Sequence, residues 1–388
     1  MMYVYDEDLQ IIGAVDNYNS LITAKRYFEN GDCEIYAPAS SELLNLATIG
    51  RYVSKDQITL YRINDIRLNT NPEEGNFLTI SGKDAKGFVD QRIVMQTSVC
   101  NGNAEAFILK LVSSALGSDA AADRKIKDSH GALIFTVFSS GFTETMTEQV
   151  TYKNLGEKIR EYCKKFGWGY KAELQNGKFV FSFYKGADRT NTVVFSPNYE
   201  NVTTTTYAED HTKMGNFALV GGEGEGDARY KVNVGNTSGA DRYEVFVDAK
   251  QLSKTIRFGE IEAAYPNGSI THDGNDYYWT VDGVNIAVLP NNSPAENEEC
   301  SLTDSVYSAQ LRSRGTEALA EYGAVTSFDS EIQPNITFVY GKDYFLGDIV
   351  KIENEFGIAK NARIVEIVEC EDENGYSTLP KFEWITEE

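Results

Sequence analysis

The chain has 388 residues, 41% of them hydrophobic and 12% aromatic, which is enough for roughly two to four domains with substantial cores. Its 36 basic and 58 acidic residues give a formal net charge of −22, which argues against non-specific binding to nucleic acid or to an anionic membrane. No run of about 18 apolar residues occurs, so we expect no membrane insertion, and the first residues do not resemble a signal peptide. The five cysteines are widely spaced and include no Cys-x-x-Cys pair, which favours free thiols over a zinc ribbon or a disulfide framework.

Residues 1–95 are predicted to form an N-terminal β-barrel. Short runs rich in Val, Ile, Thr and aromatic residues alternate with turn signals, the pattern of a small barrel or sandwich. The expected strands are residues 11–15, 21–28, 33–37, 57–69 and 77–82.

Residues 96–190 change in character and predict an α/β insert domain. Apolar residues at helical spacing between 104 and 115 predict a helix that ends at Gly117. Asn154 is a good N-cap for a second helix, which Gly167 closes. The dipeptide Asn176-Gly177 predicts a hairpin. Three alternating phenylalanines of its second strand share a face and are expected in the core: Phe179, Phe181 and Phe183.

The remaining chain predicts three further segments. Residues 191–260 are expected to be the first part of a second barrel, and residues 326–388 its closing strands, at 336–340, 348–353, 362–370 and 382–385. Residues 261–325 between them predict a smaller mixed domain. Its helix is expected to be capped by Ser301, to run to about Tyr322 and to be weakened by Gly315.

The stretch from Gly222 to Gly226 alternates glycine with glutamate. If it is extended, one face carries no side chain and the other carries Glu223 and Glu225. A bare face predicts a close-packed junction between strands or between chains. A phosphate-binding loop is disfavoured, because the loop is acidic and a strand-like segment follows it. A glycosidase pair or a calcium site formed by the two glutamates remains a weaker alternative.

Other signatures of catalysis are missing from the sequence. The three histidines are not in zinc-binding spacing, and no Gly-x-Ser-x-Gly elbow is present. We therefore predict no catalytic residue, no cofactor and no metal.

Several motifs, in their order, resemble the tail hub family of siphophages, which is related to the N-terminal hub region of tail-associated lysins. The resemblance covers nearly the whole chain. Its motifs are Val4–Asp6, Ile12–Asp16, Arg26-Tyr27, Tyr184–Thr190, Asn216–Gly226 with Arg229, Arg242–Ala249, Asp343–Val350 and Arg363–Glu369.

The resemblance implies a mainly β protein with two small β-barrel domains and an α/β domain, assembled as a homotrimeric, non-enzymatic tail hub. Implied partners are the distal tail protein hexamer, the tape-measure protein C-terminus and receptor-binding or tip proteins, while genomic DNA passes without specific binding. The implied location is the virion tail tip, after assembly in the bacterial host cytoplasm. Relatives with a lysin carry a hydrolase after the hub, and that activity is expected to be absent here, since the chain stops at Glu388.

Residues of these motifs are the structural and interface candidates. They are Asp188, Arg189, Gly221, Gly222, Glu223, Gly224, Glu225, Gly226, Arg229, Arg242, Glu244, Asp248, Gly347 and Asp348. A carbohydrate-binding or weakly hydrolytic tail-associated protein is the alternative, supported by the 23 tyrosines and the acidic pair.

Overall fold

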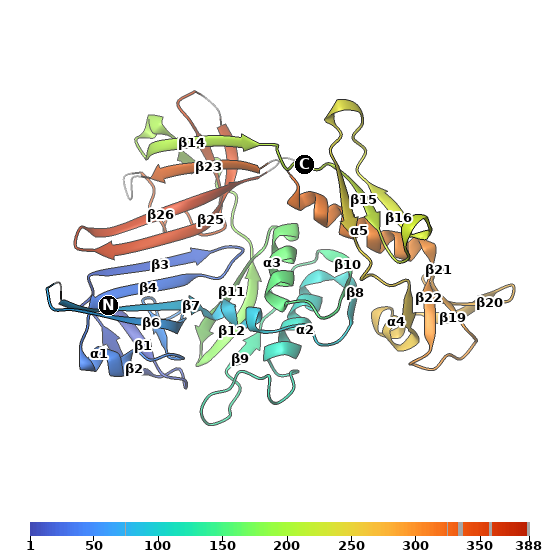
Figure 1. The fold of residues 1–388 in the computed structure, drawn as a ribbon, viewed down its shortest axis with the longest axis horizontal. Coiled ribbons are helices and arrows are strands. Elements are labelled where there is room, and N and C mark those ends of the chain that lie inside the picture. The colour runs from blue at the N-terminus through green and yellow to red at the C-terminus, as the bar shows by residue number, and fades with distance from the viewer. Residues whose placement is uncertain (74, 324, 333–336, 357–358, 386–388) are drawn as a thin grey trace.

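The computed structural model describes residues 1–73, 75–323, 325–332, 337–356 and 359–385, and only the backbone of residues 202–207 and 325–332. The chain is mainly β, with a central mixed segment, as the sequence predicted (Figure 1). None of the described helices is long and apolar enough to cross a membrane.

The N-terminal part forms a curled sheet with the strand order β3-β4-β7-β6-β5-β1-β2. Side chains from most of these strands meet in one apolar core, which includes Val4, Ile35 and Ile80. The predicted strands are present, together with a short helix that the sequence analysis did not predict, α1, whose first turn is capped by Ser40. The elements are β1 (Met2–Tyr5), β2 (Ile11–Val15), β3 (Ser20–Arg26), β4 (Asp32–Pro38), α1 (Ser41–Leu46), β5 (Tyr52–Ser54), β6 (Tyr61–Asn71), β7 (Gly75–Asp84) and the 3-10 helix η1 (Ala85–Gln91).

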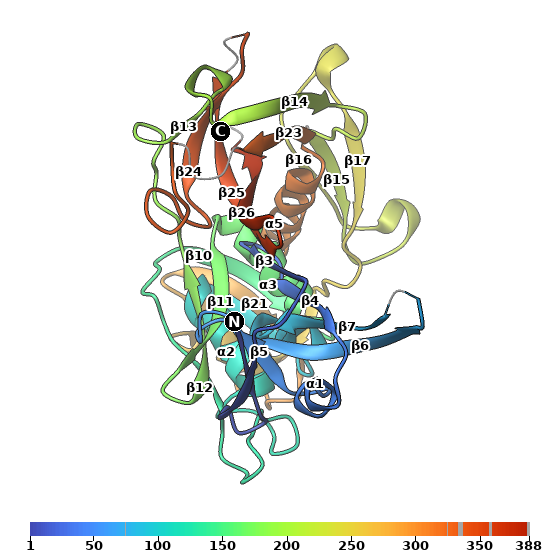
Figure 2. The ribbon, with the colours of Figure 1, turned by 90° about the vertical axis from the view of Figure 1, so that its left-hand side faces the viewer.

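The C-terminal strands extend this same sheet. They are β13 (Val194–Phe195), β24 (Ile349–Glu353), β25 (Ala359–Asp372) and β26 (Gly375–Trp384). Strand β25 pairs antiparallel with β3, from Ser20 opposite Asp372 to Arg26 opposite Glu366. The two β-rich ends of the chain therefore form one eleven-stranded sheet, visible side by side in Figures 1 and 2. Among the described strands its order ends at β13 and at β2, so it does not close into two separate rings.

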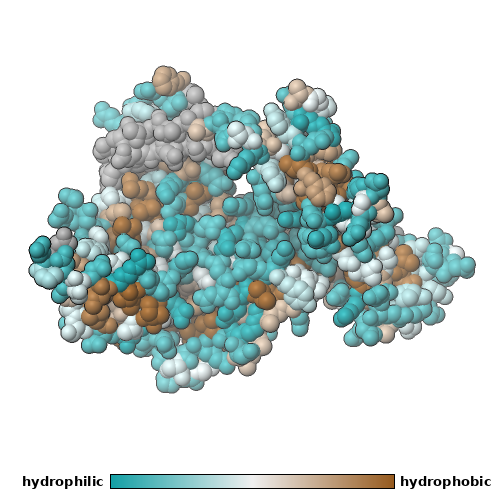
Figure 3. Space-filling view, viewed as in Figure 1, coloured by the Kyte–Doolittle hydropathy of each residue, from teal (hydrophilic) through white to brown (hydrophobic). Residues whose placement is uncertain are grey.

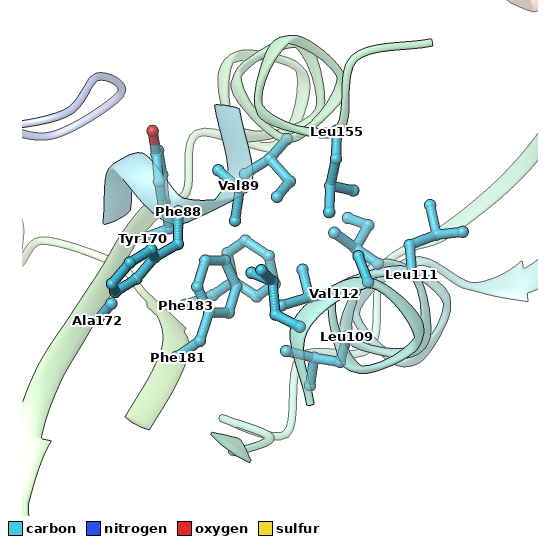
Figure 4. Close-up of a cluster of buried hydrophobic side chains, with 14 of the residues drawn as sticks. Phe88, Val89, Leu109, Leu111, Val112, Leu155, Tyr170, Ala172, Phe181 and Phe183 are labelled. Carbon is cyan, nitrogen blue, oxygen red and sulfur yellow. The ribbon is translucent and has the colours of Figure 1, made fainter. Parts of the chain in front are cut away.

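The central segment packs two helices against a three-stranded sheet. Helix α3 begins after Asn154, whose side chain accepts the Glu157 N–H, and ends at Gly167 in the left-handed region, as predicted. Figure 4 shows Phe181 and Phe183 in the core between these helices and β12, and Phe179 is equally buried. The elements are β8 (Ser98–Asn103), α2 (Ala104–Leu116), β9 (Phe135–Val137), β10 (Thr145–Val150), α3 (Leu155–Phe166), β11 (Gly169–Gln175) and β12 (Lys178–Tyr184).

Residues 211–323, here called the side domain, leave and rejoin the C-terminal part through a two-stranded stem. The stem strands β14 (Val202–Asp210) and β23 (Val325–Ile332) pair antiparallel. The polar run Thr203–Thr206 predicts an exposed segment, but these side chains lie outside the described residues. Figure 1 shows the side domain as a separate lobe on the right.

Two sheets and two helices build the side domain. One sheet has the order β16-β15-β17 and is covered by α5, and the other has the order β18-β22-β21-β20-β19. The elements are β15 (Phe217–Gly221), η3 (Gly226–Ala228), β16 (Lys231–Val234), η4 (Gly239–Asp241), β17 (Glu244–Asp248), β18 (Thr255–Arg257), α4 (Phe258–Ala264), β19 (Ser269–Asp273), β20 (Asp276–Val281), β21 (Val284–Leu289), β22 (Glu299–Leu302) and α5 (Asp304–Glu321).

This arrangement differs from the sequence expectation at two points. The strands around the glycine-rich stretch pair with one another under α5, whereas we expected them beside the C-terminal strands. Helix α5 has Thr303 at its N-cap position, not Ser301. Gly315 helps this helix to pack, because a Cβ atom there would lie 2.6 Å from side-chain atoms of both Val220 and Val234.

Candidate functional site

The glycine-rich stretch forms a compact turn, here called the glycine turn (residues 221–229). Strand β15 ends at Gly221, and the chain reverses so that the Gly222 N–H donates to the Tyr230 carbonyl at 2.8 Å. Gly224 has a φ of +99°, a region that residues with a side chain rarely adopt. The predicted extended segment with alternating faces is therefore wrong, because the turn requires a left-handed residue in its middle.

Close packing occurs in the glycine turn from Gly221 to Gly224, where a Cβ atom on Gly224 would lie 3.0 Å from the Ala228 carbonyl oxygen, and it ends before Gly226. A Cβ atom on Gly222 would lie 2.5 Å from the Tyr307 hydroxyl, and one on Gly221 would lie 2.6 Å from Arg229 Nε. A Cβ atom on Gly226, by contrast, would meet no heavy atom of the described residues within 4 Å. The packing partners thus lie in the same chain: α5 packs against Gly222, and Arg229 of the turn itself packs against Gly221.

Arg229 and Tyr307 hold the shape of the glycine turn. Arg229 donates from Nε to the Gly222 carbonyl at 2.9 Å and from Nη2 to the Gly221 carbonyl at 2.8 Å. Its guanidinium also pairs with Asp248, and this hydrogen bond lowers the pKa of the Asp248 carboxyl. The Tyr307 hydroxyl accepts the Glu223 N–H at 2.7 Å. Two long side chains therefore fix a segment whose own sequence is flexible.

The two glutamates of the turn have different surroundings. The Glu223 carboxylate accepts the Lys254 N–H at 2.8 Å, while Glu225 is exposed. In the described part of the chain, no group of three His, Cys, Asp or Glu residues could hold a metal ion.

The sheet face opposite α5, here called the outer face, carries the candidates Glu244 and Asp248. Glu244, Phe246 and Asp248 alternate along β17 and therefore point to the same side. Phe246 is 56% exposed and lies beside Leu219, which is 37% exposed. In the mostly hydrophilic surface of Figure 3, apolar side chains gather over the β15–α5 region.

Arg242 closes one end of the outer face. It donates to Glu244 at 2.6 Å, and its guanidinium carbon lies 3.4 Å from the Phe217 ring centroid. The outer face therefore combines exposed apolar side chains, Phe246 and Leu219, with charged groups paired within the chain.

The other four candidates lie far from the glycine turn, at the base of β24. Asp348 is only 3% exposed and pairs with Arg189. Its carboxylate also accepts the N–H groups of Ala187 at 2.7 Å and Phe345 at 2.9 Å. Asp188 is exposed, and its carboxylate accepts a hydrogen bond from the Thr190 N–H at 3.0 Å. Asp348 thus connects the segment that follows β12 to the start of β24 within the subunit.

Gly347 belongs to a three-way contact here called the Tyr27 junction. Tyr27 is fully buried between β3, the start of β11 and the loop before β24. A Cβ on Gly169 would lie 2.4 Å from the Tyr27 ring and one on Gly347 2.2 Å from it, and Gly347 has a φ of +94°. The Tyr27 hydroxyl donates to the Gly167 carbonyl at 2.9 Å. Tyr27 falls within one of the sequence motifs, but the sequence could not identify its partners, which lie about 140 residues or more away.

A second contact that the sequence analysis missed is the charged junction between α3 and α5. It consists of Glu148, Lys158, Glu161, Lys165, Arg314 and Glu317. Lys165 lies 2.7 Å from Glu317, and Arg314 lies 3.2 Å from Glu161. The only signal in the sequence was the charge spacing on the two helices, which is also common on exposed helices.

Comparisons with known proteins agree with this fold. The sequence matches the family described as Siphovirus ReqiPepy6 Gp37-like protein over residues 1–382. No curated protein matches it by sequence.

Three solved structures are similar over nearly their whole length. A tail protein from Neisseria meningitidis MC58 has 10% identity and a TM-score of 0.55, covering 98% of this chain and 95% of that one. The 43 kDa tail protein of prophage MuSo2 from Shewanella oneidensis has 10% identity and a TM-score of 0.54, covering 98% and 97%. Prophage tail protein gp18 from Listeria monocytogenes EGD-e has 11% identity and a TM-score of 0.51, covering 98% and 94%.

At these identities the structures establish the fold alone, and the family match establishes the family. The chain belongs to the Siphovirus ReqiPepy6 Gp37-like family.

Proposed function

We propose that this chain is a structural protein of the phage tail, and that it is the trimeric hub that joins the distal tail ring and tail tube to the tip or receptor-binding apparatus. The observation that carries the proposal is the family match over residues 1–382, to which the full-length likeness to three tail proteins adds support. The proposed location is the tail tip, after assembly in the host cytoplasm.

The continuous sheet supports a ring-forming role. Pairing of β3 with β25 joins two β-rich units within one subunit, so three subunits would present six such units. Six units match the symmetry of the proposed partner, a distal tail protein hexamer. We keep the units 1–95, 96–190 and 326–388 as a proposal, with residues 211–323, the side domain, as an excursion from the C-terminal unit in place of the boundary at 260.

Further partners in this proposal are the tape-measure protein C-terminus and the receptor-binding or tip proteins. The net charge of −22 supports a channel that genomic DNA passes without specific binding, because like charges repel. Titration with duplex DNA at low salt should give no complex. Binding that weakens with added salt would contradict this part of the proposal.

We propose no catalytic role. The Glu223 carboxylate is engaged by the Lys254 backbone, and it shares no metal site with Glu225 in the described residues. Wild type should release no sugar from peptidoglycan or polysaccharide. Release that disappears in Glu223→Gln/Glu225→Gln would instead support a hydrolase.

The outer face is the surface through which we propose that the side domain meets another tail subunit. Phe246 and Leu219 offer apolar contact, and Arg242, Glu244 and Asp248 surround them with charge. The test variant is Phe246→Glu, with Tyr152→Glu as control, since Tyr152 is exposed on the central segment. Phe246→Glu should lower assembly with tail partners at an unchanged melting temperature. Equal assembly of both variants would remove the outer face from the proposal.

Assembly state tests the whole proposal. Light scattering and particle images of the chain, alone and with the distal tail protein of the same phage, should show a trimer with a threefold ring. A monomer under both conditions would contradict the hub role.

A further inference from the structure

The side domain is attached to the rest of the chain by a narrow stem. Beyond the β14–β23 ladder, the Gly215 N–H donates to the Tyr322 carbonyl at 2.7 Å, which closes the two connections against each other. A body held at one narrow stem can change its orientation without unfolding, provided that its other contacts open.

Among the described residues, two contacts join the side domain to the central segment, and a partly open cavity lies at each. Helix α4 approaches β8 around a cavity of about 520 Å³, whose lining includes Val99 and Ala264. Helix α5 approaches α3 and β10 around a cavity of about 250 Å³ at the charged junction. Loosely packed contacts of this kind contribute less dispersion energy than a filled core.

The charged junction contains three acids and three bases. Glu317 of α5 pairs with Lys165 of α3 at 2.7 Å, and Arg314 reaches Glu161 at 3.2 Å. These pairs connect the side domain directly to the central segment, and both require ionised carboxylates.

Glu148 is the acid of the junction with the weakest partner. Its nearest cation is Lys158 at 3.7 Å, and that ammonium already lies 2.8 Å from Glu161. In the described residues, the side-chain carbonyls of Gln149 and Gln310 are buried without hydrogen-bond partners and line the same cavity. An ionised Glu148 therefore adds a negative group to a place that already has an excess of acceptors.

Groups from every neighbouring element act on Glu148. Burial, helped by the charges of Glu317 and Glu161, raises its pKa to about 7, while Lys158 and Lys165 oppose this shift. The remaining neighbours are Cys100 of β8, Tyr162 of α3 and Arg314 of α5.

We propose that Glu148 makes docking of the side domain dependent on pH. The docked arrangement holds Glu148 protonated, and ionisation of Glu148 favours release of α5 from α3 and β10. The stem then acts as the hinge, while each body keeps its own core.

The direction follows from proton linkage. Glu148 has a pKa of about 7 when docked, against its ordinary value of 4.5 when exposed, so docking takes up a proton. Docking therefore weakens as the pH rises from 4.5 to 7, by at most roughly 300-fold in the docking constant. Burial opposes the shift, but the hydrogen bond and charge of Lys165 lower the pKa of Glu317 below its ordinary value of 4.5. Protonation of Glu317 therefore weakens docking when the pH falls below that value. Docking should therefore be tightest near pH 4.5 and weaker at pH 8 than at pH 5.5.

The experiment measures the distance between the two bodies. Spin labels on Lys178→Cys and Asp276→Cys, both exposed positions, are placed in a Cys370→Ser background, because the other four cysteines are buried. Pulsed electron paramagnetic resonance should give one docked distance at pH 5.5 and a growing second population at pH 8. A distribution identical at both values would overturn the proposal, whatever the variants do.

Two substitutions identify the group responsible. Glu148→Gln keeps the shape of a protonated carboxyl and should stay docked at pH 8. Glu157→Gln is the matched control, since Glu157 is an exposed acid near the same cavity, and it should behave as wild type. Undocking of Glu148→Gln at pH 8 to the wild-type extent would also overturn the proposal. If Glu148→Gln does not fold, the pH titration of wild type remains decisive.

Discussion

The Tyr27 junction and the charged junction both join segments that are distant in sequence, but by opposite means. At the Tyr27 junction a ring fills the space left by two glycines, and its hydroxyl is satisfied by a backbone carbonyl. At the charged junction, long side chains surround a cavity. Among the described residues, the side-chain carbonyls of Gln149 and Gln310 beside it have no hydrogen-bond partner. A filled contact resists opening as a unit, whereas an ionic contact beside a cavity responds to pH and salt.

Removing the Tyr27 ring should have the largest effect on the free energy of unfolding. Tyr27→Ala leaves a cavity where β3, β11 and the loop before β24 meet, and we expect a loss of about 3–5 kcal/mol in the free energy of unfolding. Chemical denaturation measures this. Tyr199→Ala removes a ring that is 57% exposed and should cost less than about 0.5 kcal/mol. Similar losses in both variants would remove the distinction between the junction and the surface.

Adding a methyl group at Gly169, against the Tyr27 ring, should have an intermediate effect on stability. In Gly169→Ala the new methyl group would lie 2.4 Å from Tyr27 and 2.8 Å from Tyr184, so the rings must move at a cost of about 1–3 kcal/mol. Gly87→Ala is the control, because its nearest neighbour is 3.7 Å away. Melting curves that show no difference between the two variants would contradict the close packing.

Breaking the charged junction should have the smallest effect on the whole molecule. Glu317→Gln weakens the ion pair of this α5 residue with Lys165 of α3, and its pair with Arg314 within α5, by about 1–2 kcal/mol, because both cations keep some solvent contact. Faster amide exchange should then be confined to α3, α5 and β10. Glu321→Gln, an exposed acid on the same helix, should leave exchange unchanged. A loss of global stability as large as that of Tyr27→Ala would contradict the comparison.

Local signals predicted the elements of the fold better than their contacts. Asn154 and Gly167 delimit α3 as expected, because a helix cap depends on residues within a few positions. The Asn176-Gly177 turn was equally local, with both residues at positive φ.

The candidate site was harder to predict because distant residues determine its shape. The glycine turn curls around Arg229 and receives the hydroxyl of Tyr307, which is 84 residues from Glu223. The alternation of glycine and glutamate contained no information about that partner. Pairing of β3 with β25 likewise joins residues about 340 positions apart. The alternation of apolar and polar residues predicts a strand but does not indicate which distant strand it pairs with.

Native-state hydrogen exchange at increasing denaturant tests the central claim most directly, which is that the side domain opens before the body around Tyr27. Amides of β3, β12 and β25 should exchange only through global unfolding. Those of α5 and β10 at the charged junction should exchange through a smaller opening that is more frequent at pH 8 than at pH 6. A single opening free energy for both regions, independent of pH, would contradict the account.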